Sequence, residues 1–169
     1  MGFFSWIFGK DNKSASQNVA NEKKSESGIS YDATLVPKLK DDHQQLLAMF
    51  GKVTQVSREK RYDEIPKLLK QFKHALQTHL VTENVRFYAY VQQHLANDSN
   101  ASSLVADLRK EMNGIANAAV QFINRYETAV FTPDVAGAFN KDLAGIGEVL
   151  VQRINTEESS LYTLYLAKY

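Results

Sequence analysis

The predicted fold is decided by the stretch Thr78-His79-Leu80-Val81-Thr82-Glu83-Asn84-Val85-Arg86-Phe87-Tyr88-Ala89-Tyr90. A series with steps of three and four residues runs through it and predicts one face of a long α-helix. The series is Ile65, Leu69, Phe72, Leu76, His79, Glu83, Phe87 and Tyr90. His79 and Glu83 interrupt an otherwise apolar face. Because an unpartnered buried carboxylate is costly, we expect the two side chains to face a metal ion, another cation or a hydrogen-bond network.

Length and composition limit the class of protein. The chain has 169 residues and a formal net charge of +1, which indicates one globular domain with some spare chain and gives no reason to expect nucleic-acid binding. It has no cysteine, so disulfides, thiolate metal sites and cysteine nucleophiles are excluded. A reducing compartment is compatible with this composition, and we expect a cytoplasmic protein.

The first thirty residues differ from the rest. Residues 1–10 are rich in aromatic side chains and too short to span a bilayer, so we interpret them as an interfacial anchor or a docking peptide for a partner protein, against a segment folded back on the domain. An anchor would place the protein at the inner membrane surface. Residues 11–30 are polar and are predicted to be a flexible linker. The folded domain is expected over residues 31–169.

Four helices are predicted in that domain. The first begins at Thr34 or Val36 and ends near Lys60, the second runs from an N-cap at Asp63 to Leu95, the third from Ser102 or Ser103 to Tyr126, and the last from Val135 to Leu166. The expected core face of the third is Leu104, Leu108, Met112, Ile115, Ala119, Phe122 and Tyr126. Short connections and the lack of strand patterns favour an all-α, antiparallel up-down-up-down four-helix bundle.

Glycines and polar residues mark the same helices. Gly145 and Gly147 are expected where a neighbouring helix packs closely, and Gly114 is expected either at such a contact, which we favour, or beside open space. His43 lies on the apolar stripe of the first helix, and Glu111 lies beside the stripe of the third. In the last helix two of the three charged residues Arg153, Glu157 and Glu158 can face the interior, and the spacing does not decide which two.

Three motifs resemble the hemerythrin or HHE cation-binding family. They are Lys40-Asp41-Asp42-His43, His79-x-x-x-Glu83, and the segment from Arg153 to Tyr162, and the similarity covers about residues 34 to 165. The resemblance implies an antiparallel four-helix bundle that holds a non-haem di-iron centre with histidine ligands and two bridging carboxylates, and that binds oxygen or senses oxygen, iron or redox state. By motif, His43 and His79 correspond to terminal ligands, and Glu83 and Glu158 to the bridging carboxylates.

The sequence also departs from the family pattern. The third helix lacks the family's histidine pair and presents Glu111, Met112, Ile115 and Ala116 instead. The histidine of the last helix is replaced by Arg153, whose guanidinium stays protonated and is not a metal ligand. The resemblance therefore predicts a degenerate site with fewer ligands than a di-iron centre uses.

Three interpretations of this site stay open. His43, His79, Glu83 and Glu158 can hold one iron or zinc ion, as a mononuclear or incomplete di-iron site. Alternatively, no metal is bound and the Arg153 guanidinium pairs with Glu83 and with Glu157 or Glu158 in a buried network. In the third interpretation Glu111 and a tyrosine, Tyr90 or Tyr126, complete the coordination.

The predicted function follows from these interpretations. We expect a regulatory sensor or an iron- or oxygen-handling protein. The alternative is a metal-free bundle that acts through a partner, because residues 146–153 resemble bacterial anti-sigma regulators. We do not expect an enzyme unless iron is bound, since the sequence has neither a phosphate-binding glycine loop nor a nucleophilic serine motif. His74 and His94 fall off the buried stripe and are expected to be solvated.

Overall fold

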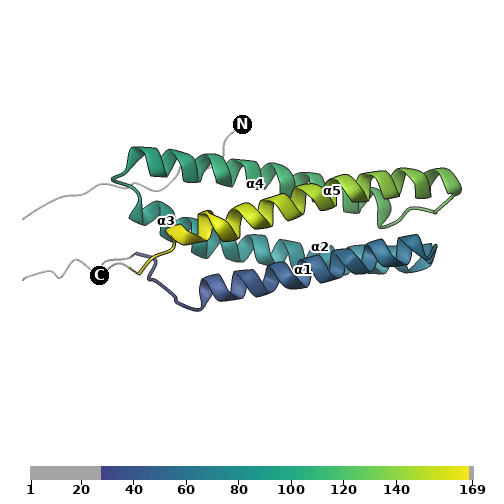
Figure 1. Ribbon diagram of the computed structural model, residues 1–169, viewed down its shortest axis with the longest axis horizontal. Coiled ribbons are helices and arrows are strands. Elements are labelled where there is room, and N and C mark those ends of the chain that lie inside the picture. The colour runs from purple at the N-terminus through teal and green to yellow at the C-terminus, as the bar shows by residue number, and fades with distance from the viewer. Residues whose placement is uncertain (1–27, 168–169) are drawn as a thin grey trace, which may run out of the picture.

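The computed structural model describes residues 28–167, and every regular element among them is helical. Four long helical rods form the structure (Figure 1). The first is α1 (Leu35–Arg58). The second is continuous from α2 (Ile65–Thr82) through the π-helical segment η2 (Glu83–Tyr88) into α3 (Ala89–His94). The others are α4 (Ser99–Tyr126) and α5 (Pro133–Ser159), with the short 3-10 turns η1 (Tyr62–Glu64) and η3 (Leu161–Leu164).

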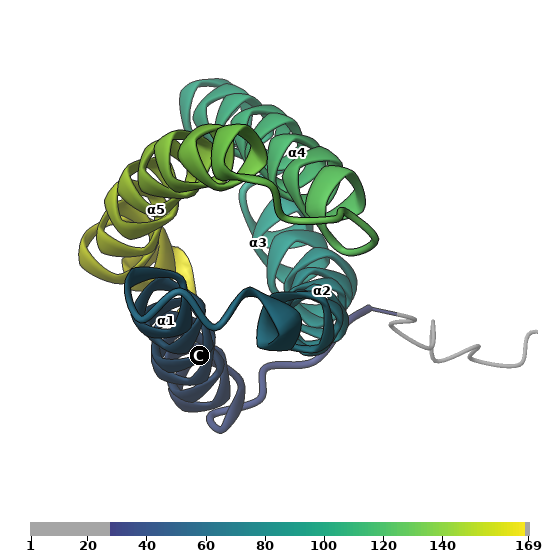
Figure 2. The ribbon, with the colours of Figure 1, turned by 90° about the vertical axis from the view of Figure 1, so that its right-hand side faces the viewer.

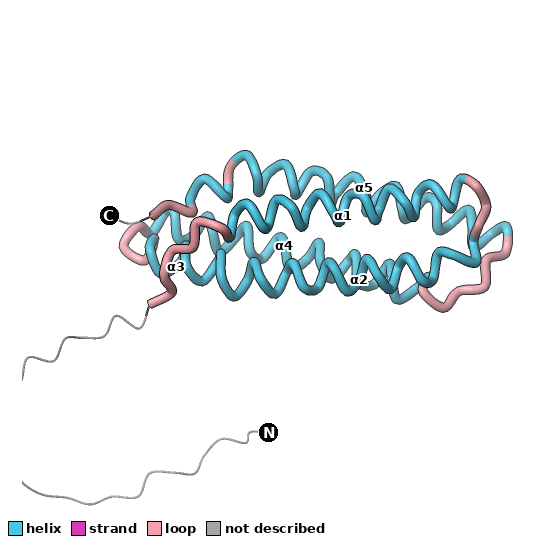
Figure 3. Tube along the Cα trace, turned by 90° about the horizontal axis from the view of Figure 1, so that it is seen from below, coloured by secondary structure: helices cyan, strands magenta, loops and turns pink. Residues whose placement is uncertain are grey.

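The rods form a bundle, as predicted. Viewed along the axis, α1 packs between α2 and α5, while α4 packs against α2 and α5 from the opposite side (Figure 2). The connections lie at the two ends of the bundle (Figure 3). The predicted segment 1–10 and residues 11–27 of the predicted linker 11–30 lie outside the described residues, so their roles stay predictions. Within residues 28–167 no helix combines the length and the apolar character that a membrane crossing requires.

The helix starts follow from capping residues. Asp98 caps α4 by accepting a hydrogen bond from the Ala101 amide at 3.0 Å. The segment predicted only as a helix break therefore begins the helix, three or four residues earlier than predicted. Thr132 caps α5 in the same way, with Pro133 in the first turn. The predicted cap at Asp63 is wrong, because the turn η1 precedes α2.

The last helix is shorter than predicted. It ends at Ser159, and Ser160 adopts φ −130° and ψ −55°, after which the chain forms η3. The prediction of a helix to Leu166 is therefore wrong. Two consecutive serines are poor helix formers, because their hydroxyls compete for backbone hydrogen bonds. The break redirects the side chains that follow it.

The core consists of two apolar clusters. One lies toward the α1–α2 and α4–α5 turns and includes Leu69, Phe72 and Phe139; the other lies toward α3 and η3 and includes Leu39, Phe87 and Leu161. The predicted faces are largely buried. An exception is Leu104, which is 55% exposed while Val105 is buried, so α4 is rotated by one residue at its start.

Close packing is found at only one of the three glycines. A Cβ atom on Gly147 would lie 2.7 Å from Phe50 Cε1, which indicates close packing between α5 and α1. Gly114 and Gly145 face open space, so the close contact expected at Gly145 is wrong, and at Gly114 the second of the two alternatives holds. The close approach at Gly147 lies on the apolar side of the functional site.

Candidate metal centre

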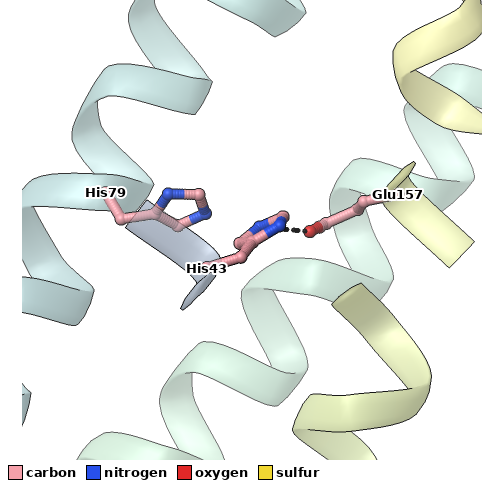
Figure 4. A group of neighbouring side chains, drawn as sticks. All are labelled: His43, His79 and Glu157. Atoms are coloured by element: carbon pink, nitrogen blue, oxygen red, sulfur yellow. Dashed lines mark ion pairs between the residues drawn. The ribbon is translucent and has the colours of Figure 1, made fainter. Parts of the chain in front are cut away.

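A layer of polar side chains separates the two apolar clusters. Each member lies on the buried face of its element and is at most 4% exposed. We call this set the polar layer: His43 from α1, His79 from α2, Glu83 and Tyr88 from η2, Arg153 and Glu157 from α5, and Tyr162 from η3. Ligand atoms of His43, His79 and Glu157 lie within 4.8 Å of one another, and His43 lies between the other two (Figure 4).

Both ring nitrogens of His43 have carboxylate partners. Nδ1 lies 2.8 Å from Oε1 of Glu158, and Nε2 lies 3.1 Å from Oε2 of Glu157. Burial lowers the pKa of His43, but the hydrogen bonds to Glu157 and Glu158 outweigh it and raise the pKa above its ordinary value. His43 is therefore the imidazole of the pair that favours the protonated form.

His79 has the opposite character. Its ring lies 4.7 Å from that of His43, and neither of its nitrogens has a hydrogen-bond partner; the carboxylate of Asp42 is 3.7 Å from Nδ1. Burial, together with the charge of His43, lowers the pKa of His79 to about 4. The imidazole is thus neutral near pH 7, with a free lone pair directed into the protein, which is the form that binds metals.

Glu83 is fully buried and only half satisfied. Its Oε1 accepts a hydrogen bond from the Tyr162 hydroxyl at 3.2 Å, while Oε2 has no partner. Burial and the nearby Glu157 carboxylate raise the pKa of Glu83 to about 8. Without a cation this carboxyl group keeps its proton at neutral pH.

Arg153 supplies the fixed positive charge of the layer. Its Nε donates to Glu157 Oε1 at 2.7 Å and its Nη2 to the Tyr88 hydroxyl at 2.9 Å. Burial alone would raise the pKa of Glu157, but the His43 hydrogen bond and the Arg153 charge lower it below the ordinary value. Nη1 has no hydrogen-bond partner, and the 62% exposed Glu111 carboxylate lies 3.7 Å from it.

The structure changes the assignment of the two neighbouring glutamates. Glu157, predicted as an additional residue, occupies the inward position. Glu158, predicted as the second bridging carboxylate, lies at the rim with a 34% exposed side chain and contacts the outward nitrogen of His43. A carboxylate in that position fixes the tautomer and the orientation of a ligand histidine. Asp42 stands in the equivalent position behind His79.

The third interpretation is not supported by the geometry. The Tyr90 hydroxyl donates to the Leu166 carbonyl at 2.6 Å, and the Tyr126 hydroxyl donates to Asp142 at 2.8 Å, each within a different apolar cluster. Glu111 lies on the exposed side of α4. Of the pairs predicted for Arg153, the ion pair with Glu157 is present, whereas the predicted pair with Glu83 is not found among the described residues.

Two tyrosines and one aspartate escaped the sequence prediction. Tyr88 and Tyr162 belong to the polar layer, and Asp42 lies behind His79. Asp42 precedes a candidate ligand in the first motif, which was a usable signal. The stray histidines differ: His74 is exposed, as expected, but the half-buried His94 packs edge-on against the Tyr90 ring at 4.0 Å, so its predicted solvation is wrong.

A cavity of about 30 Å³ adjoins the polar layer on the side of the Phe72 cluster. Its wall includes His43, His79, Arg153 and Glu157 on the polar side and Met112 and Gly147 on the apolar side. The volume corresponds to about one water-sized molecule. The layer therefore has room for a small additional group next to its ligand atoms.

The unpaired atoms of the polar layer include donors that suit a cation. Within residues 28–167 the buried side-chain atoms without a hydrogen bond are His79 Nδ1 and Nε2, Glu83 Oε2 and Arg153 Nη1. All belong to the polar layer, where an unpaired polar atom is costly. Imidazole and carboxylate donors suit iron and zinc, so the residues present fit such an ion.

Comparison with known proteins agrees with this chemistry. A family model described as the hemerythrin HHE cation binding domain matches residues 34–165, which is most of the chain. Searches of curated proteins and of solved structures give no match.

Proposed function

The chain belongs to the hemerythrin HHE cation-binding domain family, and on that premise we propose that its polar layer binds a single iron or zinc ion. Domains of this family bind metal ions, typically iron. The proposed ligands are His43 through Nε2, His79, Glu83 and Glu157. They come from α1, α2, η2 and α5, and we take these rods to follow the antiparallel up-down-up-down order, which their short connections favour.

One observation carries the proposal: His79 and Glu83 are buried with unpaired ligand atoms. A cation in the layer would receive the lone pair of His79 and the free oxygen of Glu83, which removes the cost of leaving them unpaired. It would also offset the loss of the proton from Glu83. The helices bring ligand atoms of His43, His79 and Glu157 within 4.8 Å of one another, so adjustments of the side chains would place them on one ion.

Two residues argue for one ion rather than two. Arg153 brings a permanent positive charge to 2.7 Å from the Glu157 carboxylate, where it repels a second cation. On α4 the inward residue at this level is Met112, a thioether that iron and zinc do not prefer beside nitrogen and oxygen donors. We therefore propose a reduced, mononuclear form of the family's site.

The biological role that fits this site is regulatory. An iron ion would supply redox chemistry, and either ion would supply a Lewis acid. The proposed ligands connect three rods, α1, α2–η2 and α5. Metal occupancy of the site therefore changes the free energy that holds these rods together. We propose that the protein senses or handles iron or oxygen through this effect of metal occupancy on the bundle, and that a partner protein binds the two states differently.

Metal content tests the proposal directly. The full chain, purified without added metal and again after incubation with Fe²⁺ or Zn²⁺, is expected to hold about one ion per chain by elemental analysis. His79→Ala should abolish this content. His74→Ala, an exposed histidine on the same helix, is the matched control and should keep it. Wild-type protein without stoichiometric metal would contradict the proposal.

A double variant tests the reduced site. Replacing Met112 and Arg153 together by His adds two imidazoles beside the cavity and removes the guanidinium charge. The metal content of this variant should rise above that of the wild type. Unchanged content in a folded double variant would show that the lost ligands are not what limits the site to one ion.

A metal-free interaction bundle is the second candidate, favoured by the ion pairs of Arg153 and His43 with Glu157. In that case the Arg153 network replaces the metal, and the bundle acts through a partner, with residues 1–10 as an anchor. Besides metal content, stability separates the two candidates, because the metal-free bundle predicts equal stability with and without Fe²⁺ or Zn²⁺.

A further inference from the structure

Tyr162 lies inside the polar layer, although it comes from the segment after the last helix. Its hydroxyl oxygen is 3.3 Å from Nε2 of His43 and 3.2 Å from Oε1 of Glu83. The ring is stacked on His43, with a centroid distance of 5.7 Å and an interplanar angle of 9°, and Phe87 contacts it edge-on at 5.1 Å. The oxygen is therefore held in a fixed position between two proposed ligands.

The helix break at Ser160 produces this position. In a continuous α-helix, a residue five positions after Glu157 would point about 140° away from it. Because α5 ends at Ser159 and η3 follows, Glu157 and Tyr162 both face the interior of the bundle. The chain thus delivers an oxygen donor to the layer from a segment outside the four long rods.

The spacing of the donor atoms matches a coordination shell. Ligands at about 2.1 Å from one ion, at angles between octahedral and tetrahedral values, are roughly 3.0 to 3.4 Å apart. His43 Nε2 lies 3.1 Å from Glu157 Oε2 and 3.3 Å from the Tyr162 oxygen, which in turn lies 3.2 Å from Glu83 Oε1. Neighbouring donors in this series are therefore as far apart as adjacent ligands of one ion, and the Glu83 carboxylate offers its second, unpaired oxygen to the same ion.

We propose that the hydroxyl oxygen of Tyr162 is a direct ligand of the bound ion and that it makes the site selective for ferric iron. This inference rests on the proposed function. The phenolic proton leaves to solvent as the oxygen binds, and no electron is transferred in this step. Tyrosine oxygen is a known iron ligand in proteins, and hard cations prefer anionic oxygen donors.

Charge supports the preference for a ferric ion. With Glu83, Glu157 and Tyr162 ionised and Arg153 protonated, three negative groups face one positive group around the ion. The excess of negative charge stabilises a trivalent ion more than a divalent one. Zn²⁺ serves as a spectroscopically silent probe of the same ligands.

The test compares the full chain with Tyr162→Phe, which removes only the hydroxyl. Ferric iron is supplied as a weak chelate, and the visible absorption spectrum is recorded after removal of excess iron. The wild type is expected to show a phenolate-to-iron charge-transfer band, and Tyr162→Phe should lose it. Zn²⁺ affinity, measured by calorimetry, should fall by at least about tenfold in the variant.

Tyr90→Phe is the matched control, because Tyr90 is a buried tyrosine whose hydroxyl contacts the Leu166 carbonyl instead of the polar layer. It should keep the band. A wild-type protein that binds iron without the band, or a Tyr162→Phe protein that keeps it, overturns this inference and leaves the proposed function intact. A wild type that binds neither ion overturns both. If Tyr162→Phe does not fold, resonance Raman spectra of the iron-loaded wild type decide, because they must contain tyrosinate ring modes.

Discussion

The Phe72 cluster and the polar layer are built by the same rods with the same spacing, but they are completed to different degrees. In the cluster, Phe139 packs against Phe122, Tyr126 and Phe131, and it is fully buried. In the adjoining layer, residues on the same helix faces include four buried atoms without a partner. The cluster is fully packed, whereas the polar layer keeps buried polar atoms without partners.

The same helical spacing thus produces one region that stabilises the fold and another that is suited to binding. Apolar side chains are satisfied by packing alone, so the cluster contributes to folding under all conditions. Polar side chains need partners, so the contribution of the layer depends on protonation and, under the proposed function, on a bound cation. The two regions should therefore respond differently to substitution, to metal and to pH.

The largest effect is expected in the cluster. Phe139→Ala should lower the free energy of unfolding by about 3 to 5 kcal/mol, because it removes a buried ring and leaves a cavity. The loss should be the same with and without Fe²⁺ or Zn²⁺, as measured by urea denaturation. A loss that shrinks markedly in the presence of metal would mean that the cluster and the layer are not independent.

The next effect belongs to the layer. A cation present at about a hundred times its dissociation constant should raise the free energy of unfolding of the wild type by about 2.7 kcal/mol. His79→Ala should remove this gain. Without metal the same variant should lose less stability than Phe139→Ala, because it also removes two unpaired buried nitrogens. Equal gains in wild type and variant would exclude His79 as a ligand.

Much of the fold could be predicted because its signals are local. The three- and four-residue steps of apolar side chains predicted each long helix, and buried Leu39, Leu69 and Leu143 agree with them. The π-helical segment Glu83–Tyr88 could not be predicted, because it inserts a residue into the turn without a change in the apolar pattern. It brings Phe87 and Tyr88 to the interior together.

For the candidate site, burial was predictable and pairing was not. The spacing predicted that His43, His79 and Glu83 face inward, and all three are buried. In the structure Glu157 faces inward and pairs with Arg153, and the spacing of charged residues in the sequence does not distinguish it from Glu158. Tyr162 reaches the layer only because α5 breaks at Ser160, and a weak helix former does not by itself predict a break.

A smaller effect is expected from pH in the cation-free protein. The folded-state pKa of Glu83 is raised to about 8 from 4.5, and that of His43 is raised above 6.5, so the folded protein keeps protons that the unfolded chain has lost. Stability should therefore fall between pH 6.5 and 8, by about 2 kcal/mol for one proton. The folded-state pKa of His79 is lowered to about 4, so its contribution makes stability rise with pH, but only below pH 6.5.

Urea denaturation with a chelator present measures this dependence. Glu83→Gln keeps the shape of the side chain and cannot ionise. In this variant the loss of stability between pH 6.5 and 8 should be limited to the contribution of His43. Excess metal should remove the decline in the wild type, because the cation then takes the place of the protons. Stability that rises from pH 6.5 to 8 in the cation-free wild type would contradict a protonated Glu83.

The smallest effect separates the two outer carboxylates. Glu158 contacts Nδ1 of His43 at 2.8 Å, whereas Asp42 is 3.7 Å from Nδ1 of His79 and is also paired with Lys38. Glu158→Ala should weaken Zn²⁺ binding by about tenfold, or about 1.4 kcal/mol, because His43 loses the group that fixes its orientation. Asp42→Ala should weaken Zn²⁺ binding less, since its contact with His79 is longer than a hydrogen bond.

Glu148→Ala, which changes an exposed glutamate of α5, is the control in the same calorimetric titration. If Glu158→Ala instead abolished binding, Glu158 would be a ligand itself, and the inward position of Glu157 would not be the one that the cation uses.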